Sequence, residues 1–333
     1  MRVFNPKLNF VSYNDLLSAI REQIHLLPRE FDLIVGVPRS GMIPACAIAL
    51  HLNVPVMDQH SFICNIAPRH GNTRKLKKAP AKPMEAASVL VVEDSVFSGR
   101  SLVTAVQQIR ESGFRGRLAT CAAIVSPEKN AIADFHFIEC APPRVFEWNL
   151  FHHNIIENAC LDLDGVLCVD PDEEDNDDGE QYRRFLLSAK LLHLPTPVIA
   201  HIVSARLEKY RAETETWLER QGIRYRQLHL LDLPSKGERI RRGAHIPHKV
   251  SVYRSTGADL FIESSLDQAN AIAAHSGKPV LWVGGMKLIP GTGLHGSVIM
   301  ESTRRWRRGK VAELERKASE VWDGIRRRLG RSR

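Results

Sequence analysis

Residues 88–102 read SVLVVEDSVFSGRSL, and this stretch decides the fold of the first half of the chain. Ser88 to Val92 is a short apolar run rich in valine, which is typical of a strand buried on both faces of a parallel sheet. Two adjacent acids, Glu93 and Asp94, end the predicted strand. A loop and an amphipathic helix that ends at Gly113 follow, so the expected order is strand, acid pair, loop and helix.

The loop after the acid pair has the composition of a phosphate site. Its hydroxyls and the backbone N–H groups at the start of the next helix suit a phosphate dianion, and the carboxylates suit the vicinal hydroxyls of a ribose. The expected contacts are Glu93, Asp94, Ser95, Ser98, Gly99, Arg100 and Ser101. The alternative is a crossover whose acids only cap the helix. Two common phosphate loops are excluded, because there is no GxxxxGK[ST] and no GxGxxG after a strand.

The stretch resembles the 5-phosphoribosyl 1-pyrophosphate (PRPP) loop of type I phosphoribosyltransferases, in which an apolar strand leads to two acids, a short spacer, Thr-Gly and a hydroxyl residue. This chain has Glu93 for the usual first Asp and Ser98 for the usual Thr, and both changes keep the chemistry. A turn with Arg39, Ser40 and Gly41 follows an upstream predicted strand and is similar to the pyrophosphate loop of the same family. In open α/β sheets such loops meet at the carboxyl ends of neighbouring strands.

A polar, basic segment at residues 65–82 lies where this family carries a mobile lid over pyrophosphate. Its cations would stabilise the charge that develops as pyrophosphate leaves, and Arg74 and Lys75 are the two candidates. Composition alone favours a disordered surface loop instead. The sequence does not identify the base that would accept a proton from the incoming nucleophile in the transfer. Asp58 and His60, just after another predicted strand, either face the site or are loop residues with local partners.

LDLDGVLC at residues 161–168 predicts a second active site. Two aspartates two positions apart, Asp162 and Asp164, followed directly by Gly165, provide a nucleophile and an acid/base group at a strand end, and together they can bind Mg²⁺. The stretch resembles the first motif of the haloacid dehalogenase (HAD) phosphatase superfamily. That resemblance implies that Asp162 attacks phosphorus to form an aspartyl-phosphate. It also implies that Asp164 protonates the leaving alcohol and then activates water.

Later segments contain the phosphate-binding groups expected from this resemblance. Ser204 directly follows a predicted strand, Val198 to Val203, in the place of the phosphate-binding Ser or Thr. Lys249 precedes the next predicted strand, where an ammonium would neutralise charge between the aspartate and the phosphate. Lys236 competes with Lys249 for this role.

The last motif is expected to supply a metal ligand. Glu263 resembles its metal-binding acid, so the expected Mg²⁺ ligands are Asp162, Asp164 and Glu263. Ser264 stands where a second acid is usual. Either Asp267 compensates for this change or the metal holds an extra water.

Composition is that of an ordinary soluble globular protein, with 44% hydrophobic and 25% charged residues in a chain of 333, which is enough for two cores. No apolar run approaches the roughly 18 residues needed to span a bilayer, and the first residues lack a signal-peptide core. We therefore expect a cytoplasmic protein. The six cysteines show no CxxC pair and are expected to be free thiols.

The net charge of +8 is concentrated at the C-terminal end, where residues 304–333 hold twelve Lys or Arg against four acids. Because the rest of the chain is balanced, we expect no nucleic-acid partner. An apolar stripe at helical spacing predicts a basic amphipathic helix in this tail. One interpretation is that this helix binds an anionic membrane surface, at the inner face of the cytoplasmic membrane, or an acidic partner such as a glycosyltransferase. The alternative is that the helix packs on its own protein.

These features predict an α/β chain of three parts: a type I phosphoribosyltransferase domain on a parallel sheet at residues 1–148, a HAD-like Rossmann-type domain with a small cap at 155–300, and the basic tail at 301–333. The combination resembles bacterial two-domain phosphoribosyltransferase–phosphatase proteins that supply ribofuranose to surface polysaccharides. The resemblance implies PRPP, Mg²⁺ and a glycan hydroxyl, including a lipid-linked one, with transfer by inversion to a β-ribofuranoside and then removal of the 5-phosphate. The alternatives are nucleobase transfer followed by 5′-nucleotidase action, and a regulatory PRPP-binding module.

Overall fold

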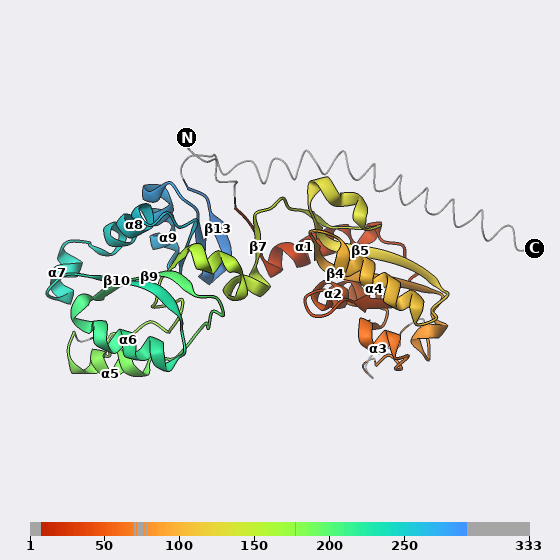
Figure 1. Cartoon of the computed structure of the whole chain (residues 1–333), viewed down its shortest axis with the longest axis horizontal. Helices are drawn as coiled ribbons and strands as arrows, with labels where there is room; N and C mark the ends of the chain where they lie inside the picture. The colour runs from red at the N-terminus through yellow and green to blue at the C-terminus, as the bar shows by residue number, and fades with distance from the viewer. Residues whose placement is uncertain (1–7, 70, 72–75, 77–78, 177, 292–333) are drawn as a thin grey trace, which may run out of the picture. The chain divides into compact units, whose positions relative to one another are not determined.

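The computed structural model describes residues 8–69, 71, 76, 79–176 and 178–291. Over these residues the chain divides into two compact units, with the boundary between Arg144 and Val145 (Figure 1). This boundary lies slightly before the predicted linker at 149–154. Arg74 and Lys75 of the predicted lid, and the predicted basic tail at 301–333, lie outside the described residues.

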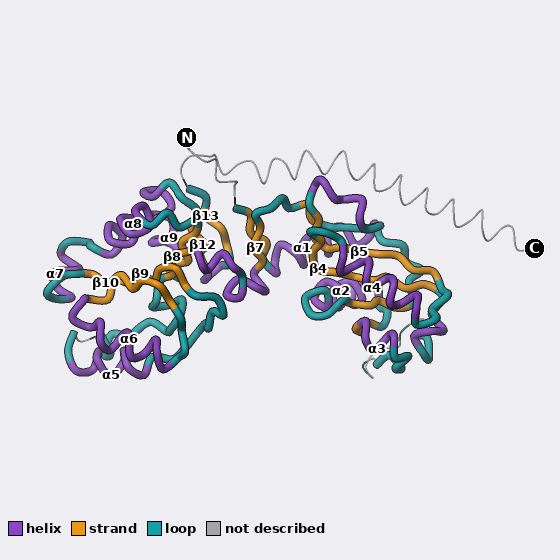
Figure 2. Tube along the Cα trace, in the orientation of Figure 1, coloured by secondary structure: helices purple, strands orange, loops and turns teal. Residues whose placement is uncertain are grey.

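The first unit is built on a five-stranded parallel sheet in the order β3-β2-β4-β5-β6. Its strands are β2 (Leu33–Gly36), β3 (Val56–Asp58), β4 (Ser88–Val96), β5 (Arg117–Val125) and β6 (Ile138–Glu139) (Figure 2). All four residues of β2 are buried, as expected for an apolar run in the middle of a parallel sheet. A separate two-stranded sheet joins β1 (Asn9–Val11) to β7 (Arg144–Phe146).

The helices described in the first unit are α1 (Tyr13–Gln23), α2 (Met42–Leu52), α3 (Gln59–Ile63) and α4 (Arg100–Glu111). The Ser12 hydroxyl and the Asp15 carboxylate form a capping box that starts α1. A 3₁₀ turn at Ile24–Leu26 follows α1, and Pro28 stops the chain from continuing as a helix. The apolar face of α4 packs on one face of β4, where Val89 and Val91 belong to the same core cluster as Leu102 and Ile109.

Strand β4 is longer than the sequence predicts. It pairs with β5 as far as Val96, opposite Val125, so Glu93 and Asp94 lie inside the strand and not after it. The reason is that β5 remains apolar and buried through Val125, so its backbone offers hydrogen-bonding partners beyond the point where the side chains of β4 become acidic. The sheet therefore fixes the backbone of both acids.

The second unit contains a six-stranded sheet in the order β10-β9-β8-β11-β12-β13. The strands run parallel except β13, which is antiparallel to β12. They are β8 (Ala159–Leu161), β9 (Ile199–Leu207), β10 (Tyr225–Leu231), β11 (Leu260–Glu263), β12 (Val280–Trp282) and β13 (Lys287–Ile289). The predicted strand before Ser204 is longer in the structure, so Ser204 lies within β9.

Helices α8 (His245–Ser255) and α9 (Leu266–Ser276) pack together, and their core includes Tyr253, Phe261 and Ile272. The other helices described in this unit are α5 (Glu180–Ser188), which packs on α6 (Arg211–Arg220), and the short α7 (Lys236–Arg241). Short 3₁₀ helices in the chain span Ile24–Leu26, Pro83–Glu85, Pro127–Ile132, Glu147–His152, Asn154–Asn158, Glu208–Tyr210 and Val283–Gly285. Among the described residues, none of the helices has the length and apolar character needed to cross a bilayer.

Candidate active sites

The acid pair of the first unit lies near the carboxyl end of β4. Glu93 and Asp94 are each 6% exposed, so both carboxyl groups are largely shielded from solvent. The Ser101 hydroxyl at the start of α4 donates to Glu93 Oε2 at 2.6 Å. Burial raises the pKa of Glu93 to about 7, and the charge of Asp94 adds to this rise while the Ser101 hydrogen bond opposes it. The carboxyl of Glu93 is thus poised between its two protonation states near neutral pH.

Helix α4 begins in the way that suits an anion. Gly99 precedes it with a φ of 81°, a left-handed conformation that glycine adopts without strain, and the Ser98 hydroxyl accepts the N–H of Arg100, the first residue of the helix, at 3.4 Å. The N–H groups that follow Arg100 in this turn point out of the helix end, in the arrangement that binds phosphate in many proteins. Ser98, Arg100 and Ser101 are exposed around this end, and Ser95 is half-buried.

The predicted pyrophosphate loop, residues 38–41, lies against β4. The N–H of Val37 donates to Val92 O at 2.9 Å, which places the loop beside the acid pair. Gly41 is packed so closely that an added Cβ would lie 2.4 Å from Val37 O and 2.8 Å from Val92 O. Arg39 is exposed and Ser40 half-buried, and the peptide bond between Pro38 and Arg39 is cis. The structure therefore brings the two predicted anion loops to neighbouring strand ends.

Asp58, one of the two residues considered as a base, has a local role. Its carboxylate accepts the Ser61 N–H at 2.9 Å and the Ser61 hydroxyl at 2.6 Å, which caps α3. His60 contacts the Cys64 thiol at 3.6 Å. The geometry therefore favours the interpretation of Asp58 and His60 as loop residues with local partners.

In the second unit, Asp162 follows β8 directly and is 5% exposed. Lys249 Nζ donates to Asp162 Oδ2 at 2.6 Å, to Glu263 Oε2 at 2.8 Å and to Gln268 Oε1 at 2.9 Å. Burial alone would lower the pKa of Lys249, but the charges of Asp162 and Glu263 outweigh it and raise the pKa. For Asp162 burial has the opposite sign and raises the pKa of the carboxyl, while the positive charge of Lys249 opposes this rise.

Lys236, the competing candidate, is engaged elsewhere: its Nζ donates to Asn176 O at 2.5 Å. Lys249 is therefore the lysine that contacts Asp162. Gln268, which holds the third proton of Lys249, was not predicted from the sequence. It lies on the first turn of α9, 19 residues after Lys249, and no local sequence pattern indicates that the two side chains meet.

Asp164 faces a partner that the sequence analysis missed. Both of its carboxylate oxygens accept hydrogen bonds from Arg206, with Nη2–Oδ1 at 2.6 Å and Nε–Oδ2 at 3.0 Å. Arg206 lies on β9, two residues after Ser204, and is 1% exposed. Ser204 is fully buried, and its hydroxyl accepts the Arg206 backbone N–H at 3.2 Å.

The expected magnesium ligands are occupied by groups of the protein. Asp162 accepts from Lys249 and from the Leu163 N–H, and Glu263 accepts from Lys249 and from two backbone N–H groups. Asp164 is bound to Arg206. Among the described residues, no group of three or more His, Cys, Asp or Glu side chains is placed to hold a metal ion. As arranged here these residues do not fit the ion, and a Mg²⁺ site at Asp162, Asp164 and Glu263 stays a prediction.

Asp170, rather than Asp267, is the further acid at this site. Asp267 is exposed on α9, whereas Asp170 lines the same cavity as Asp162 and Asp164. An added Cβ on Gly165 would lie 2.3 Å from Ser264 Oγ and 2.9 Å from Asp170 Oδ2, so these two side chains approach the loop after β8 closely. Burial raises the pKa of Asp170, and the charges of Asp164 and Glu263 add to this effect.

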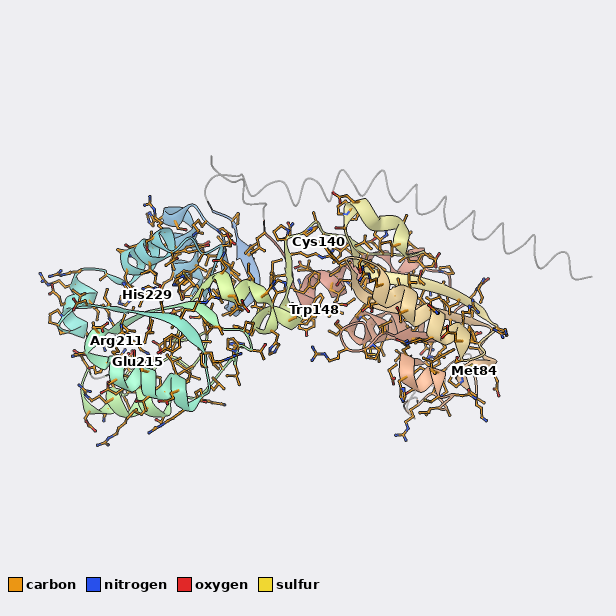
Figure 3. All side chains as sticks on the ribbon, viewed as in Figure 1. Met84, Cys140, Trp148, Arg211, Glu215 and His229 are labelled. Carbon is orange, nitrogen blue, oxygen red and sulfur yellow. The ribbon has the colours of Figure 1, made fainter. Side chains whose placement is uncertain are left out.

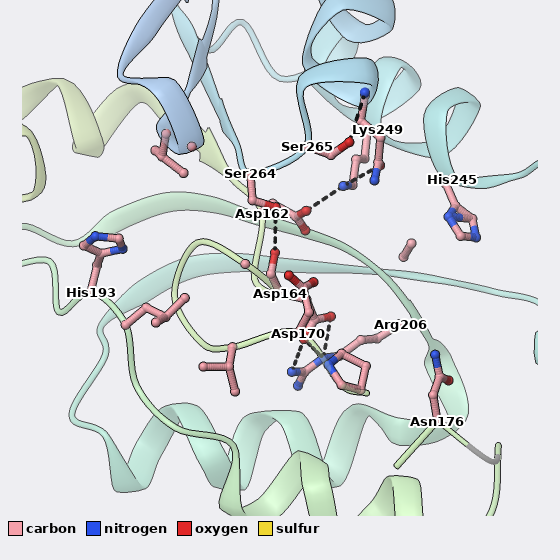
Figure 4. A pocket seen from close by; sticks show the side chains of 18 of the residues that line it. Asp162, Asp164, Asp170, Asn176, His193, Arg206, His245, Lys249, Ser264 and Ser265 are labelled. Carbon is pink, nitrogen blue, oxygen red and sulfur yellow. Dashed lines mark hydrogen bonds and ion pairs between the residues drawn. The ribbon is translucent and has the colours of Figure 1, made fainter. Parts of the chain in front are cut away.

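These side chains border a cavity of about 740 Å³ within the second unit (Figure 4). One wall carries the charged groups Asp162, Asp164 and Lys249, and the others include Asn176, His193 and His245. The volume is several times that of a phosphate group, so the cavity has room for a phosphorylated molecule of moderate size. A buried aspartate beside a buried lysine at the carboxyl end of a parallel strand is an arrangement suited to phosphorus chemistry.

The first unit is thus a parallel α/β domain whose two predicted anion loops lie at the carboxyl ends of neighbouring strands. Residues 11–155 match the family model "Phosphoribosyl transferase domain". The N-terminal part of the chain is a type I phosphoribosyltransferase domain, as the sequence predicted, while the residues of the PRPP loop stay a prediction. The match ends before the motifs of the second unit. That unit is a further α/β domain, and the family model does not identify its superfamily.

Individual relatives match the same part of the chain. The xanthine-guanine phosphoribosyltransferase of Chromohalobacter salexigens is 28% identical over 132 residues, which cover 39% of this chain and 76% of the relative. The orotate phosphoribosyltransferase of Pyrobaculum islandicum is 31% identical over 107 residues, covering 32% of this chain and 52% of the relative. The chain thus spans about half the length of this orotate relative. The structure of the purine phosphoribosyltransferase from Pyrococcus horikoshii aligns with 42% of this chain at 18% identity and a TM-score of 0.29.

Proposed function

We propose that the chain is a bifunctional enzyme that transfers 5-phosphoribosyl from PRPP to an acceptor and then removes the 5-phosphate. The observation that supports the first step is the position of Glu93 and Asp94 near the carboxyl end of β4, from which a short loop leads to the start of α4. The carboxylates would bind the ribose hydroxyls of Mg²⁺-PRPP, and the N–H groups of α4 would bind its 5-phosphate. Arg39, Ser40 and Gly41 would hold the pyrophosphate.

In the transfer, the bond between C1 of the ribose and the pyrophosphate oxygen breaks and the acceptor oxygen bonds to C1 from the opposite face. The acceptor proton leaves to solvent or to a base that the described residues do not identify. Pyrophosphate departs with the Mg²⁺ with which the substrate enters. Direct displacement inverts the configuration, so the product is a β-ribofuranoside that still carries the 5-phosphate.

The second unit would remove that phosphate, in the manner that its resemblance to HAD phosphatases implies. An Asp162 carboxylate oxygen would bond to phosphorus while the bond from phosphorus to the C5 oxygen breaks, and the departing alkoxide would take a proton from the Asp164 carboxyl, which regains one from the attacking water in the next step. Water then cleaves the aspartyl-phosphate, which releases orthophosphate and regenerates Asp162. Lys249 would offset the negative charge between Asp162 and the phosphate, and this contact supports the proposal.

For the acceptor we propose a glycan hydroxyl, including one on a lipid-linked glycan, because a chain with both activities leaves an uncharged ribofuranose on its product. A nucleobase is the second candidate, and the activities for which the relatives are named favour it: xanthine-guanine and orotate phosphoribosyltransferase. A membrane or glycosyltransferase contact through the basic tail rests on its sequence alone.

Incubation of the full chain with PRPP, Mg²⁺ and either a glycan acceptor or free nucleobases tests these proposals. The favoured function predicts a dephosphorylated ribosylated glycan together with one pyrophosphate and one orthophosphate per product. Nucleobase transfer would instead give a nucleoside. Binding of PRPP without any product would indicate a regulatory module and contradict both enzymatic readings.

A further inference from the structure

We propose that Arg206 is a positioning residue for the hydrolytic step, which holds the Asp164 carboxylate in one orientation at the wall of the cavity. This inference rests on the hydrolysis proposed for the second unit. Arg206 was not among the residues that the sequence motifs predicted, and its position follows from the geometry of β9 and of the loop after β8. Figure 4 shows its guanidinium group directed at Asp164.

The contact between the two side chains is a fork-to-fork pair. Arg206 Nη2 donates to Asp164 Oδ1 at 2.6 Å, and Arg206 Nε donates to Oδ2 at 3.0 Å and to Oδ1 at 3.2 Å. Two parallel hydrogen bonds fix the plane of a carboxylate as well as its position, which a single contact does not. Rotation of Asp164 about its side-chain bonds would break at least one of them.

Arg206 is itself held by the surrounding segments. Its Nη1 donates to Thr214 Oγ1 on α6 at 3.4 Å, and its Nη2 contacts Cys168 Sγ at 3.2 Å. Thr214 and Cys168 are fully buried. The guanidinium therefore links β9, α6 and the loop after β8, and it does not depend on solvent for its orientation.

The loop that carries Asp164 is also fixed. The Gly165 N–H donates to Cys168 O at 2.7 Å, and the Leu167 N–H donates to Leu163 O at 2.8 Å. Gly165 has a φ of 74°, which lets the chain turn directly after Asp164. With its backbone closed by these bonds and its carboxylate held by Arg206, Asp164 has little freedom left.

Exposure indicates which member of the pair meets a bound molecule. The Arg206 side chain is 0% exposed and the Asp164 side chain 20% exposed. Both residues border the cavity, but only Asp164 has exposed side-chain surface there, so we infer that Arg206 acts through Asp164. In the proposed reaction Asp164 serves the departing alcohol, and a proton transfer of this kind depends on the alignment of donor and acceptor.

An arginine suits this role and a lysine does not, since an ammonium group keeps the charge but cannot form the planar fork.

The test compares Arg206→Lys and Arg206→Ala with wild type in the full chain. The substrates are ribose 5-phosphate, whose alkoxide needs a proton to leave, and p-nitrophenyl phosphate, whose phenolate does not. Arg211→Lys is the matched control. Arg211 also donates hydrogen bonds from two nitrogens to one carboxylate, that of Glu208, but it lies on α6 outside the cavity. Glu215 lies beside it (Figure 3).

We expect Arg206→Lys to lower kcat for ribose 5-phosphate by about 100-fold with little change in KM, as loss of alignment does. The fall for p-nitrophenyl phosphate should be several times smaller, and added guanidinium ion should restore part of the activity of Arg206→Ala while ammonium does not. Arg211→Lys should behave as wild type. Circular dichroism checks that the variants fold.

A rise in KM at unchanged kcat would overturn the inference, because Arg206 would then bind the phosphate itself. So would equal losses on both esters without rescue in folded variants, which would indicate a purely structural role. If Arg206→Ala fails to fold, the comparison of the two esters with Arg206→Lys still decides. Inactivity of wild type towards both esters would instead contradict the proposed hydrolysis, and with it any catalytic use of the pair.

Discussion

At the scale of single residues, Glu93 is the group of the first site whose charge the fold controls most strongly. Burial raises the pKa of its carboxyl from 4.5 to about 7. Ionisation therefore costs free energy in the folded state that it does not cost in the unfolded chain. The first unit consequently loses stability as the pH rises from about 4.5 to about 7, and below this window the effect is absent.

The substitution Glu93→Gln should remove this loss. Between pH 4.5 and 7 we expect wild type to lose up to roughly 3 kcal/mol relative to the variant, as a pKa difference of this size implies. Hydrogen exchange of the β4 amides at several pH values measures the effect within the first unit. Ser101→Ala, which removes the hydroxyl that favours the charged form, should enlarge it. Parallel pH profiles for wild type and Glu93→Gln would contradict the assignment.

Lys249 is the corresponding residue of the second site. Lys249→Met should destabilise the second unit by about 3–5 kcal/mol, because two buried carboxylates lose their counter-charge. Lys236→Met should cost about 1 kcal/mol or less, since it removes one hydrogen bond to a backbone carbonyl. Urea unfolding followed by the fluorescence of the fully buried Trp217 compares the two variants. Similar losses would show that Lys249 is not the lysine that balances the two acids.

The residues that sequence reasoning found are those at strand ends. Glu93, Asp162 and Glu263 each come where an apolar run stops, so the pattern itself marks them. Arg206 could not be found in this way because its partner Asp164 is 42 positions away and only the fold joins them. One signal was present: an arginine inside an apolar strand, two positions from Ser204, must lie on the same face of the sheet as that serine.

At the scale of elements, the sequence predicted the order of strands and helices well and their ends less well. Helix α2 ends at Leu52, where Asn53 forms a left-handed cap, a local feature of a kind that a sequence pattern can indicate. Strands β4 and β9 both continue past the predicted ends. Strand ends depend on the hydrogen bonds that a neighbouring strand offers, and such bonds between distant segments leave no trace in a local pattern.

The contact between the loop at residues 38–41 and β4 yields a prediction at this scale. Gly41→Ala would place a Cβ within 2.8 Å of the carbonyl oxygens of Val37 and Val92, so the loop must move away from the acid pair. We expect the affinity for PRPP to fall about tenfold or more, the usual effect of displacing a binding loop by a fraction of an ångström. Isothermal titration calorimetry with PRPP and Mg²⁺ measures it.

The matched control for that experiment is Gly237→Ala in α7 of the second unit. An added Cβ there meets nothing nearer than Ser235 Oγ at 3.8 Å. It should leave PRPP binding unchanged. Equal affinities for Gly41→Ala and wild type would mean that the loop does not contribute to the site.

At the scale of the whole molecule, each unit is proposed to carry out one chemical step. The first unit is a phosphoribosyltransferase domain, and a transfer from PRPP leaves a 5-phosphate on its product. The second unit has its own sheet, its own cavity and a buried aspartate–lysine contact at a strand end. The family of the first unit was predictable because its motif is local and specific. The chemistry of the second unit rests on geometry and resemblance, and its test must be chemical.

Mass spectrometry of the product formed by Asp162→Asn from PRPP, Mg²⁺ and a competent acceptor is the most direct test of this account. The variant should still release pyrophosphate and should accumulate the 5-phosphorylated ribosyl product, while wild type and the exposed control Asp232→Asn yield the product without phosphate. Appearance of only the dephosphorylated compound with Asp162→Asn would contradict the division of the reaction between the two units.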